Sequence, residues 1–137
     1  MAEKIRRVDY FYFWLEDKPG EGARLLGKLK DARVNLLSFT AFPGGGGQSQ
    51  LTVVPENPGG FVAAAKSAGL SPSGSKECFF VQGEDHVGAA HDVLKRLADA
   101  NINCVASNGC AGAGGTFGMV IFLKPGDVPA ASKVLAA

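Results

Sequence analysis

The sequence lacks a large excess of charge of either sign. Its 137 residues include 14 Lys and Arg and 13 Asp and Glu, so the formal net charge is +1 at pH 7. The longest basic cluster is Lys4–Arg7. A chain balanced in this way offers no extended positive surface to a phosphate backbone or an anionic membrane. We therefore expect no nucleic-acid partner and no membrane partner.

Long apolar segments are also missing. No apolar run approaches the roughly 20 residues that a membrane-spanning helix needs. The opening MAEKIRRVDY is charged and is not followed by an apolar region with a small-residue cleavage site, so no secretory signal is visible. The three cysteines Cys78, Cys104 and Cys110 are odd in number and widely spaced. We therefore interpret them as free thiols of a protein in a reducing compartment. These absences predict a cytoplasmic protein with no disulfide, metal or other cofactor.

Glycine, in contrast, is abundant. There are 19 glycines, concentrated in turns, in a chain whose 46% hydrophobic and 20% charged residues predict an ordinary packed core. The run GCAGAGGTFG contains a G-x-G step, but it lies between two predicted strands. A phosphate-binding loop joins a strand to a helix, so we interpret this run as a hairpin.

An internal repeat organises the chain. Shifting the sequence by 68 positions places Glu16–Asn35 on Glu84–Asn103, with eight identities in 20 positions. The repeat predicts a tandem duplication, with a first domain at 1–74 and a second at 75–137. The identical pairs are Glu16/Glu84, Asp17/Asp85, Gly20/Gly88, Leu26/Leu94, Leu29/Leu97, Asp31/Asp99, Ala32/Ala100 and Asn35/Asn103.

Both halves have the same predicted order of elements, βαββα. Apolar and aromatic runs predict first strands, and leucines spaced by three and four residues predict the helices that follow. A fourth strand is available only to the first half, at 70–73. The fold class is therefore α+β: two tandem ferredoxin-like (βαββαβ) plaits, antiparallel sheets with helices on one face. The other expected strands are 9–15, 34–42 and 49–54, then 77–82, 102–108 and 117–123, with short second helices at 61–68 and 128–136.

The second half has no candidate for a fourth strand before Ala137. We expect its open sheet edge to be covered by residues 3–8 or by another subunit. Halves of about 60 residues are marginal alone, so we expect them to pack intimately. Unpaired strand edges also favour assembly into a homodimer.

The segment WLEDKPGEGARLLGKLKDARVNLLS resembles the first half of an ACT domain. In that family a strand ends in an acidic residue and Pro-Gly, a helix follows, and an asparagine opens the second strand. The second half resembles it too, with Val87 in place of the proline, so the resemblance covers essentially the whole chain. It implies a regulatory module that binds an amino acid or similar small ligand, and it does not imply an enzyme. We expect such a module to act on a separate partner enzyme or as a metabolite sensor.

The resemblance directs attention to the two strand-to-helix turns. Backbone N–H groups at a helix start lack internal partners and carry partial positive charge, which suits a ligand carboxylate. Glycine permits close approach there, an aspartate can meet an ammonium group, and an asparagine amide can donate and accept. The candidate ligand residues are Asp17, Pro19, Gly20, Glu21, Gly22, Asn35 and Leu36 in the first half, and Asp85, His86, Val87, Gly88, Ala89, Asn103 and Cys104 in the second.

The same residues also have a structural interpretation. The aspartates Asp17 and Asp85 can cap helices, Pro19 suits a first helical turn, and the asparagines can stabilise tight turns. His86 can simply be an exposed loop residue. The alternative function is accordingly an interaction module that serves assembly and binds no ligand.

Overall fold

The first strand is longer than the sequence pattern indicates. In a computed structural model, which describes residues 3–137, β1 runs over Lys4–Glu16 and includes the predicted strand 9–15 as its second part. The described chain forms two compact units, one of residues 9–76 and one of residues 3–8 with 77–137. β1 therefore contributes to both units, and these units differ from the predicted domains because residues 3–8 pack with the second half.

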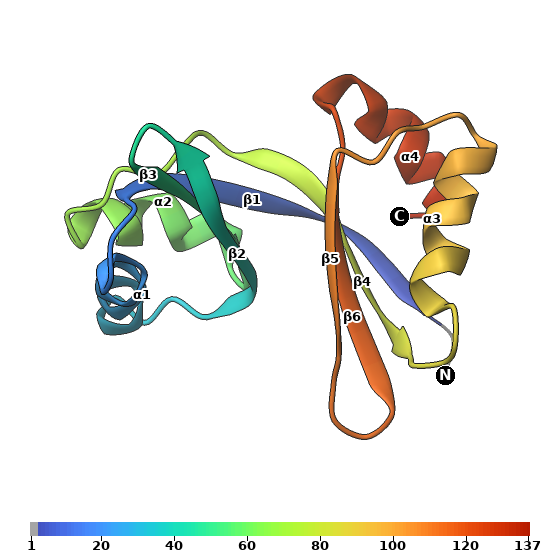
Figure 1. Ribbon diagram of the computed structural model, residues 1–137, viewed down its shortest axis with the longest axis horizontal. Coiled ribbons are helices and arrows are strands. Elements are labelled where there is room, and N and C mark those ends of the chain that lie inside the picture. Colours follow the sequence, from blue (N-terminus) through green and yellow to red (C-terminus); the bar gives the residue numbers. More distant parts are fainter. Residues whose placement is uncertain (1–2) are drawn as a thin grey trace. The chain divides into compact units, whose positions relative to one another are not determined.

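In the unit of residues 9–76, a helix and a hairpin follow β1 (Figure 1). β3 pairs antiparallel with both β1 and β2. Gln50 of β3 therefore lies between Trp14 of β1 and Phe42 of β2. The elements are α1 (Glu21–Asp31), β2 (Leu36–Gly45), β3 (Gln48–Pro55) and α2 (Pro58–Ser67).

The core of this unit follows from the alternation of β1. Phe11, Phe13 and Leu15 are buried on one face, because successive strand side chains point to opposite sides. α1 and α2 pack on that face. The rings of Phe11 and Phe61 have centroids 4.5 Å apart, which ties α2 to the sheet.

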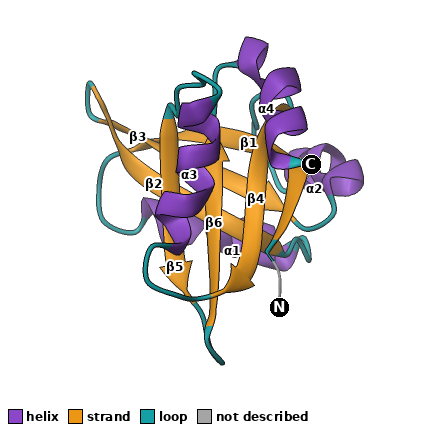
Figure 2. Ribbon diagram, turned by 90° about the vertical axis from the view of Figure 1, so that its right-hand side faces the viewer, coloured by secondary structure: helices purple, strands orange, loops and turns teal. Residues whose placement is uncertain are grey.

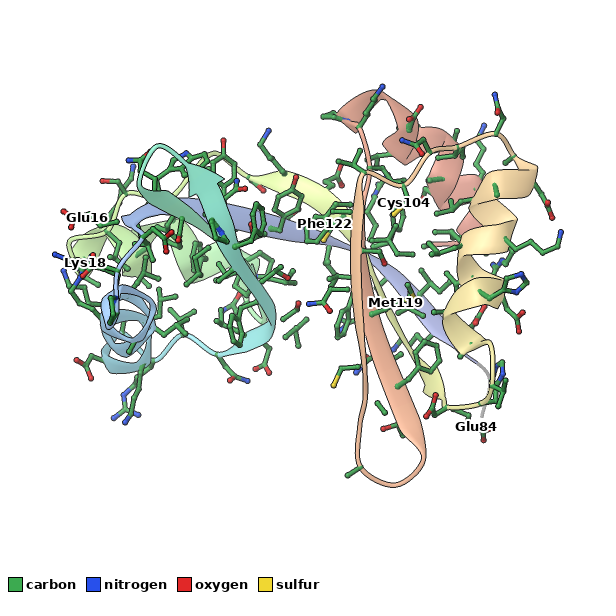
Figure 3. The ribbon with its side chains drawn as sticks, in the orientation of Figure 1. Glu16, Lys18, Glu84, Cys104, Met119 and Phe122 are labelled. Atoms are coloured by element: carbon green, nitrogen blue, oxygen red, sulfur yellow. The ribbon has the colours of Figure 1, made fainter. Side chains whose placement is uncertain are left out.

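The unit of residues 3–8 and 77–137 has the same order of elements after its first strand (Figure 2). β6 pairs antiparallel with both β4 and β5. Its core joins Val93 and Leu97 of α3 to sheet residues such as Met119 (Figure 3). The elements are β4 (Lys76–Glu84), α3 (Ala89–Asp99), β5 (Ala106–Ala111), β6 (Thr116–Phe122), a short 3-10 turn η1 (Pro125–Asp127) and α4 (Val128–Leu135).

The first residues of β1 lie beside β4 and cover the sheet edge that the second half leaves open. Arg7 Nε is 3.1 Å from Glu77 Oε2, and the Arg6 guanidinium lies 5.4 Å from the centre of the Phe80 ring. Ile5 packs against the core of this unit. The prediction that residues 3–8 supply the missing strand is confirmed.

The predicted fourth strand at 70–73 is wrong, because these residues form neither helix nor strand. Ser73 N–H donates to Tyr12 O at 2.9 Å, but Tyr12 N–H donates to the Ser73 hydroxyl, not to a backbone carbonyl. Pro72 has no N–H with which to extend the ladder. One backbone bond and one side-chain bond therefore replace a paired strand.

The hydrogen-bonded order of the strands is β2-β3-β1-β4-β6-β5, so the fold is α+β with six strands in an antiparallel sheet. The predicted fold class is confirmed to this extent. None of the helices in residues 3–137 is long and apolar enough to cross a membrane.

Candidate functional site

The turn between β1 and α1 is shaped by Gly20. This residue is the N-cap of α1 with φ 90° and ψ −14°, a left-handed conformation that residues with a Cβ rarely adopt. No side chain caps the helix start. The N-terminal amides of α1 therefore remain without a side-chain acceptor, and their partial positive charge suits an anion.

Asp17 does not cap α1, contrary to its structural interpretation. Its backbone N–H donates to Gly47 O at 2.8 Å, and its Oδ1 accepts a hydrogen bond from Ser49 Oγ at 3.2 Å. Both partners belong to the hairpin that β2 and β3 form, Gly47 in its turn and Ser49 at the start of β3. The carboxylate is thus oriented by the hairpin and remains exposed beside the turn.

The other charges at this turn are paired. Lys18 Nζ lies 2.9 Å from Glu16 Oε2 (Figure 3), and this hydrogen bond raises the pKa of Lys18. Arg24 donates to both carboxylate oxygens of Glu21 at 3.1 Å. The bond from Arg24 lowers the pKa of Glu21. Glu21 is one of the candidate ligand residues. Because its carboxylate already pairs with Arg24, Glu21 is less available to a ligand than Asp17.

The turn between β4 and α3 repeats this geometry. Gly88 is the N-cap with φ 84° and ψ 12°, again without a side-chain cap, so Asp85 does not cap its helix either. Asp85 N–H donates to Gly115 O at 2.8 Å, which matches the bond between Asp17 and Gly47 with each residue shifted by 68 positions. Val87 is fully exposed. At 3.1 Å, His86 Nδ1 contacts the Val87 carbonyl oxygen. Ala89, the remaining candidate here, is buried.

The two candidate asparagines lie at the other end of the helices. Asn35 and Leu36 follow the C-terminus of α1, and Asn103 and Cys104 follow that of α3. Each helix has 11 residues. At a rise of 1.5 Å per residue such a helix is about 16 Å long. Within one unit a small ligand cannot contact both the turn and the asparagine, contrary to the expectation that they lie side by side.

Each of these helices ends in a left-handed residue that is not glycine. Arg33 has φ 60° and Asn101 has φ 59°. The next amides close the helix ends, Val34 N–H donating to Leu29 O and Ile102 N–H to Leu97 O, both at 2.9 Å. Asparagine tolerates this conformation, whereas arginine does so at a cost in free energy.

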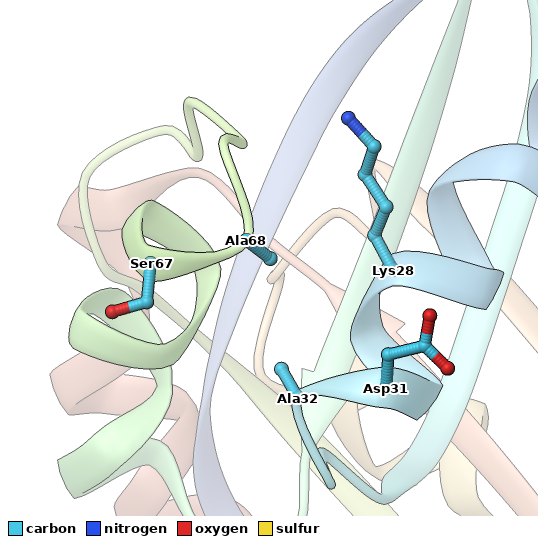
Figure 4. A pocket seen from close by; sticks show the side chains of 5 residues that line it. All are labelled: Lys28, Asp31, Ala32, Ser67 and Ala68. Carbon is cyan, nitrogen blue, oxygen red and sulfur yellow. The ribbon is translucent and has the colours of Figure 1, made fainter.

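Cavities surround the C-terminal end of α1. One of about 650 Å³ is lined by Leu26, Lys30, Arg33, Asn35, Leu36 and the exposed ring of Phe39. Another of about 320 Å³ lies between the ends of α1 and α2 and is lined by Lys28, Asp31, Ala32, Ser67 and Ala68 (Figure 4). Of the residues predicted from the sequence, only Asn35 and Leu36 lie in this region, and the charged residues around them carry no sequence motif that would have identified them.

Cys104 lies in a partly buried position between α3 and β5 (Figure 3). Its Sγ donates to Ala106 O at 3.2 Å. Burial raises the pKa of the Cys104 thiol, so the thiol stays protonated at neutral pH. A protonated thiol is a poor nucleophile.

No protein-family model and no curated protein matches this chain. Solved structures do match. Protein BT0572 from Bacteroides thetaiotaomicron has a TM-score of 0.80 at 17% identity, covering 96% of this chain and 88% of that one. The ligand-free regulatory subunit of aspartate kinase from Thermus thermophilus has a TM-score of 0.66 at 11% identity, covering 99% and 95%. The structure of the aspartokinase alpha and beta subunits has a TM-score of 0.61 at 18% identity, and the match covers 98% of this chain and 95% of that one.

Identities this low establish the fold and nothing finer. The neighbours that carry a functional description include regulatory subunits and domains of aspartate kinase, matched over nearly the full length of this chain. The fold of this chain is accordingly ACT-like, as the folds of these neighbours are.

Proposed function

We propose that this chain is a regulatory module of two tandem ACT-type domains, 1–74 and 75–137, that binds a small molecule and acts on a separate metabolic enzyme. The observation that carries the proposal is the fold shared with the Thermus thermophilus regulatory subunit over 99% of the chain. The repeated turn geometry, with left-handed Gly20 and Gly88 and matching bonds from Asp17 and Asp85, supports the duplication. On this proposal the chain is not an enzyme.

The proposed ligand is an L-amino acid. Its carboxylate would sit on the uncapped amides at the start of α1 or α3, and Asp17 or Asp85 would meet its ammonium group. A Cβ built on Gly20 or Gly88 meets no atom within 4 Å, so each turn opens onto free space. Because Asn35 and Asn103 lie a helix length away, they would join such a site only from a second chain. A homodimer would provide this, and sedimentation at micromolar protein tests it.

A thermal-shift screen against the twenty standard amino acids tests the ligand. A dissociation constant of about 100 μM corresponds to roughly −5.5 kcal/mol, which a few charge-assisted hydrogen bonds can supply. At tenfold excess over that constant the ligand would stabilise the fold by about 1.4 kcal/mol. A chain of this size then melts several degrees higher.

Gly20→Val and Gly88→Val should abolish the part of the shift that comes from binding at the turns, since a branched side chain strains the turn and blocks the approach of a ligand. Gly69→Val is the matched control. Gly69 also has a left-handed φ, of 77°, and free space around it, but it follows the end of α2. Calorimetry separates lost binding from lost stability. If no amino acid binds the wild-type chain in either assay, the ligand proposal is wrong and a module that serves only assembly replaces it.

A further inference from the structure

A cavity of about 360 Å³ lies at the C-terminal end of α1, where the loop before β2 meets the loop before α2. This volume is within the range of roughly 300 to 1,000 Å³ that small-molecule sites occupy. Its charged and polar lining residues are Arg33, Asn35, Glu56 and Asn57, and its apolar lining includes Val34 and Phe61.

The polar and apolar groups are separated within this cavity. Phe61 is only 1% exposed and Val34 is half-buried, so the apolar groups belong to the core side. Arg33, Asn35 and Glu56 are exposed and form the rim. An apolar floor with a few convergent polar groups is the common composition of a small-molecule site.

Two hydrogen bonds fix the rim. Asn35 Nδ2 donates to Glu56 Oε2, and Glu56 N–H donates to Asn35 O, both at 2.9 Å. They join the two loops and hold the Glu56 carboxylate in place. One carboxylate oxygen accepts the bond from Asn35, which leaves the other as an acceptor for a ligand.

Opposite charges line the cavity without pairing. Within residues 3–137, neither Arg33 nor Glu56 takes part in an ion pair. Asn57, which starts α2, makes no capping hydrogen bond through its side chain. A guanidinium, a carboxylate and an amide are thus available around one cavity.

Arg33 also occupies a backbone conformation that disfavours it. Its φ is 60°, where glycine or asparagine is the usual residue. Strained residues of this kind gather at binding and catalytic sites. The same φ recurs at Asn101, so the helix end sets the conformation, and only the arginine side chain is particular to this unit.

We propose that this cavity binds a small zwitterion, with the ligand carboxylate on Arg33, its ammonium group on Glu56 and its apolar part against Val34. The class of ligand, an α-amino acid, rests on the proposed function. The site itself is distinct from the Gly20 turn, which lies at the opposite end of α1. Tight binding would then require both the carboxylate and the ammonium group of the ligand, because each makes a charge-assisted hydrogen bond.

The other unit lacks these groups. At a shift of 68 positions, Asn101 stands in place of Arg33, Lys124 in place of Glu56 and Pro125 in place of Asn57. The second unit therefore lacks the Arg33 guanidinium and has a lysine ammonium group where the first unit has the Glu56 carboxylate. The proposed site therefore belongs to the unit of residues 9–76 alone and predicts one such site per chain.

Titration calorimetry of the full chain tests the proposal. Each of the twenty L-amino acids is titrated, and the tightest is compared with its analogues that lack the amino group or the carboxylate. Only the zwitterion should bind measurably. Glu56→Gln and Arg33→Gln should each raise the dissociation constant at least tenfold, whereas the matched control Lys124→Gln should leave it unchanged.

A second measurement needs no variant and therefore still tests the site if a variant folds poorly. In the wild-type chain, the side-chain NH₂ resonances of Asn35 should shift when the ligand is added. Binding that persists in Glu56→Gln and Arg33→Gln but is lost in Gly20→Val would overturn this site and retain the proposed function. Binding of either single-charge analogue as tightly as the amino acid would also overturn it. Absence of any binding would refute both this site and the amino-acid ligand.

Discussion

Replacing Arg33 by glycine should stabilise the fold while weakening ligand binding. The residue is exposed, has φ 60°, and forms no ion pair within the described part of the chain. Its backbone N–H donates to Lys30 O at 3.0 Å, a bond that glycine can also make. The substitution therefore removes strain without removing a contact that holds the helix end.

The magnitude follows from two opposing effects. A left-handed conformation costs an L-residue about 1 to 2 kcal/mol, which glycine does not pay. Glycine in turn loses roughly 0.5 to 1 kcal/mol more conformational entropy on folding. The net gain lies between about 0 and 1.5 kcal/mol, and its midpoint of about 0.75 kcal/mol corresponds to a rise of about 3 to 6 °C in the melting temperature of a unit this size.

Scanning calorimetry without ligand measures this rise, and Asn101→Gly is the matched control. Asn101 has φ 59° at the equivalent helix end, but asparagine tolerates the conformation, so its replacement should gain less than about 0.5 kcal/mol. A melting temperature of Arg33→Gly at or below that of the wild type would refute the reasoning from strain. An equal gain in both variants would show that arginine carries no special cost.

Other perturbations give further tests. Gly44→Ala should cost about 1 kcal/mol and shift the emission of Trp14, because a Cβ on Gly44 would lie 2.6 Å from Trp14 Cζ3; an unchanged spectrum would contradict this contact. Burial raises the pKa of Cys104, so its thiol should react with Ellman's reagent more slowly than exposed Cys110 at pH 8. The folded chain keeps the Cys104 proton to higher pH than the unfolded chain, so this group should lower stability as pH rises above about 9, an effect that Cys104→Ser should remove. Deletion of residues 1–8 should lower the melting temperature by several degrees, because β4 loses its neighbouring strand; an unchanged melting curve would show that this strand contributes nothing.

The repeat made the fold predictable from the sequence to a large extent. Residues 68 positions apart do occupy matching places, as the left-handed Gly20 and Gly88 show. The apolar spacing located the helices, because the buried Leu25 and Leu29 lie one turn apart on α1. Local patterns of this kind act within a few residues and can be seen in one stretch of chain.

Features that depend on distant residues were harder to predict. The predicted strand at 70–73 does not form, because Pro72 has no N–H with which to extend the ladder. The candidate site failed differently: the turn and Asn35 are close in sequence, but the 11 residues of α1 separate them in space. Arg33 and Glu56 are far apart in sequence and line the same cavity only because β3 returns beside β2. No local motif brings them together.

Similarity between the two halves does not by itself indicate a ligand. Gly20 and Gly88 have φ of 90° and 84°, so each turn requires glycine whether or not anything binds there. The pair Asn35 and Asn103 is different, because Asn35 bonds to Glu56 whereas the equivalent partner of Asn103 is Lys124, with which it forms no bond in the described structure. The fold constrains the shared positions and leaves the differing ones free. The change from Arg33 and Glu56 to Asn101 and Lys124 is therefore more informative about function than the glycines are. The two halves are alike at the starts of their first helices and differ chemically at the ends, so ligand specificity is to be sought at those ends.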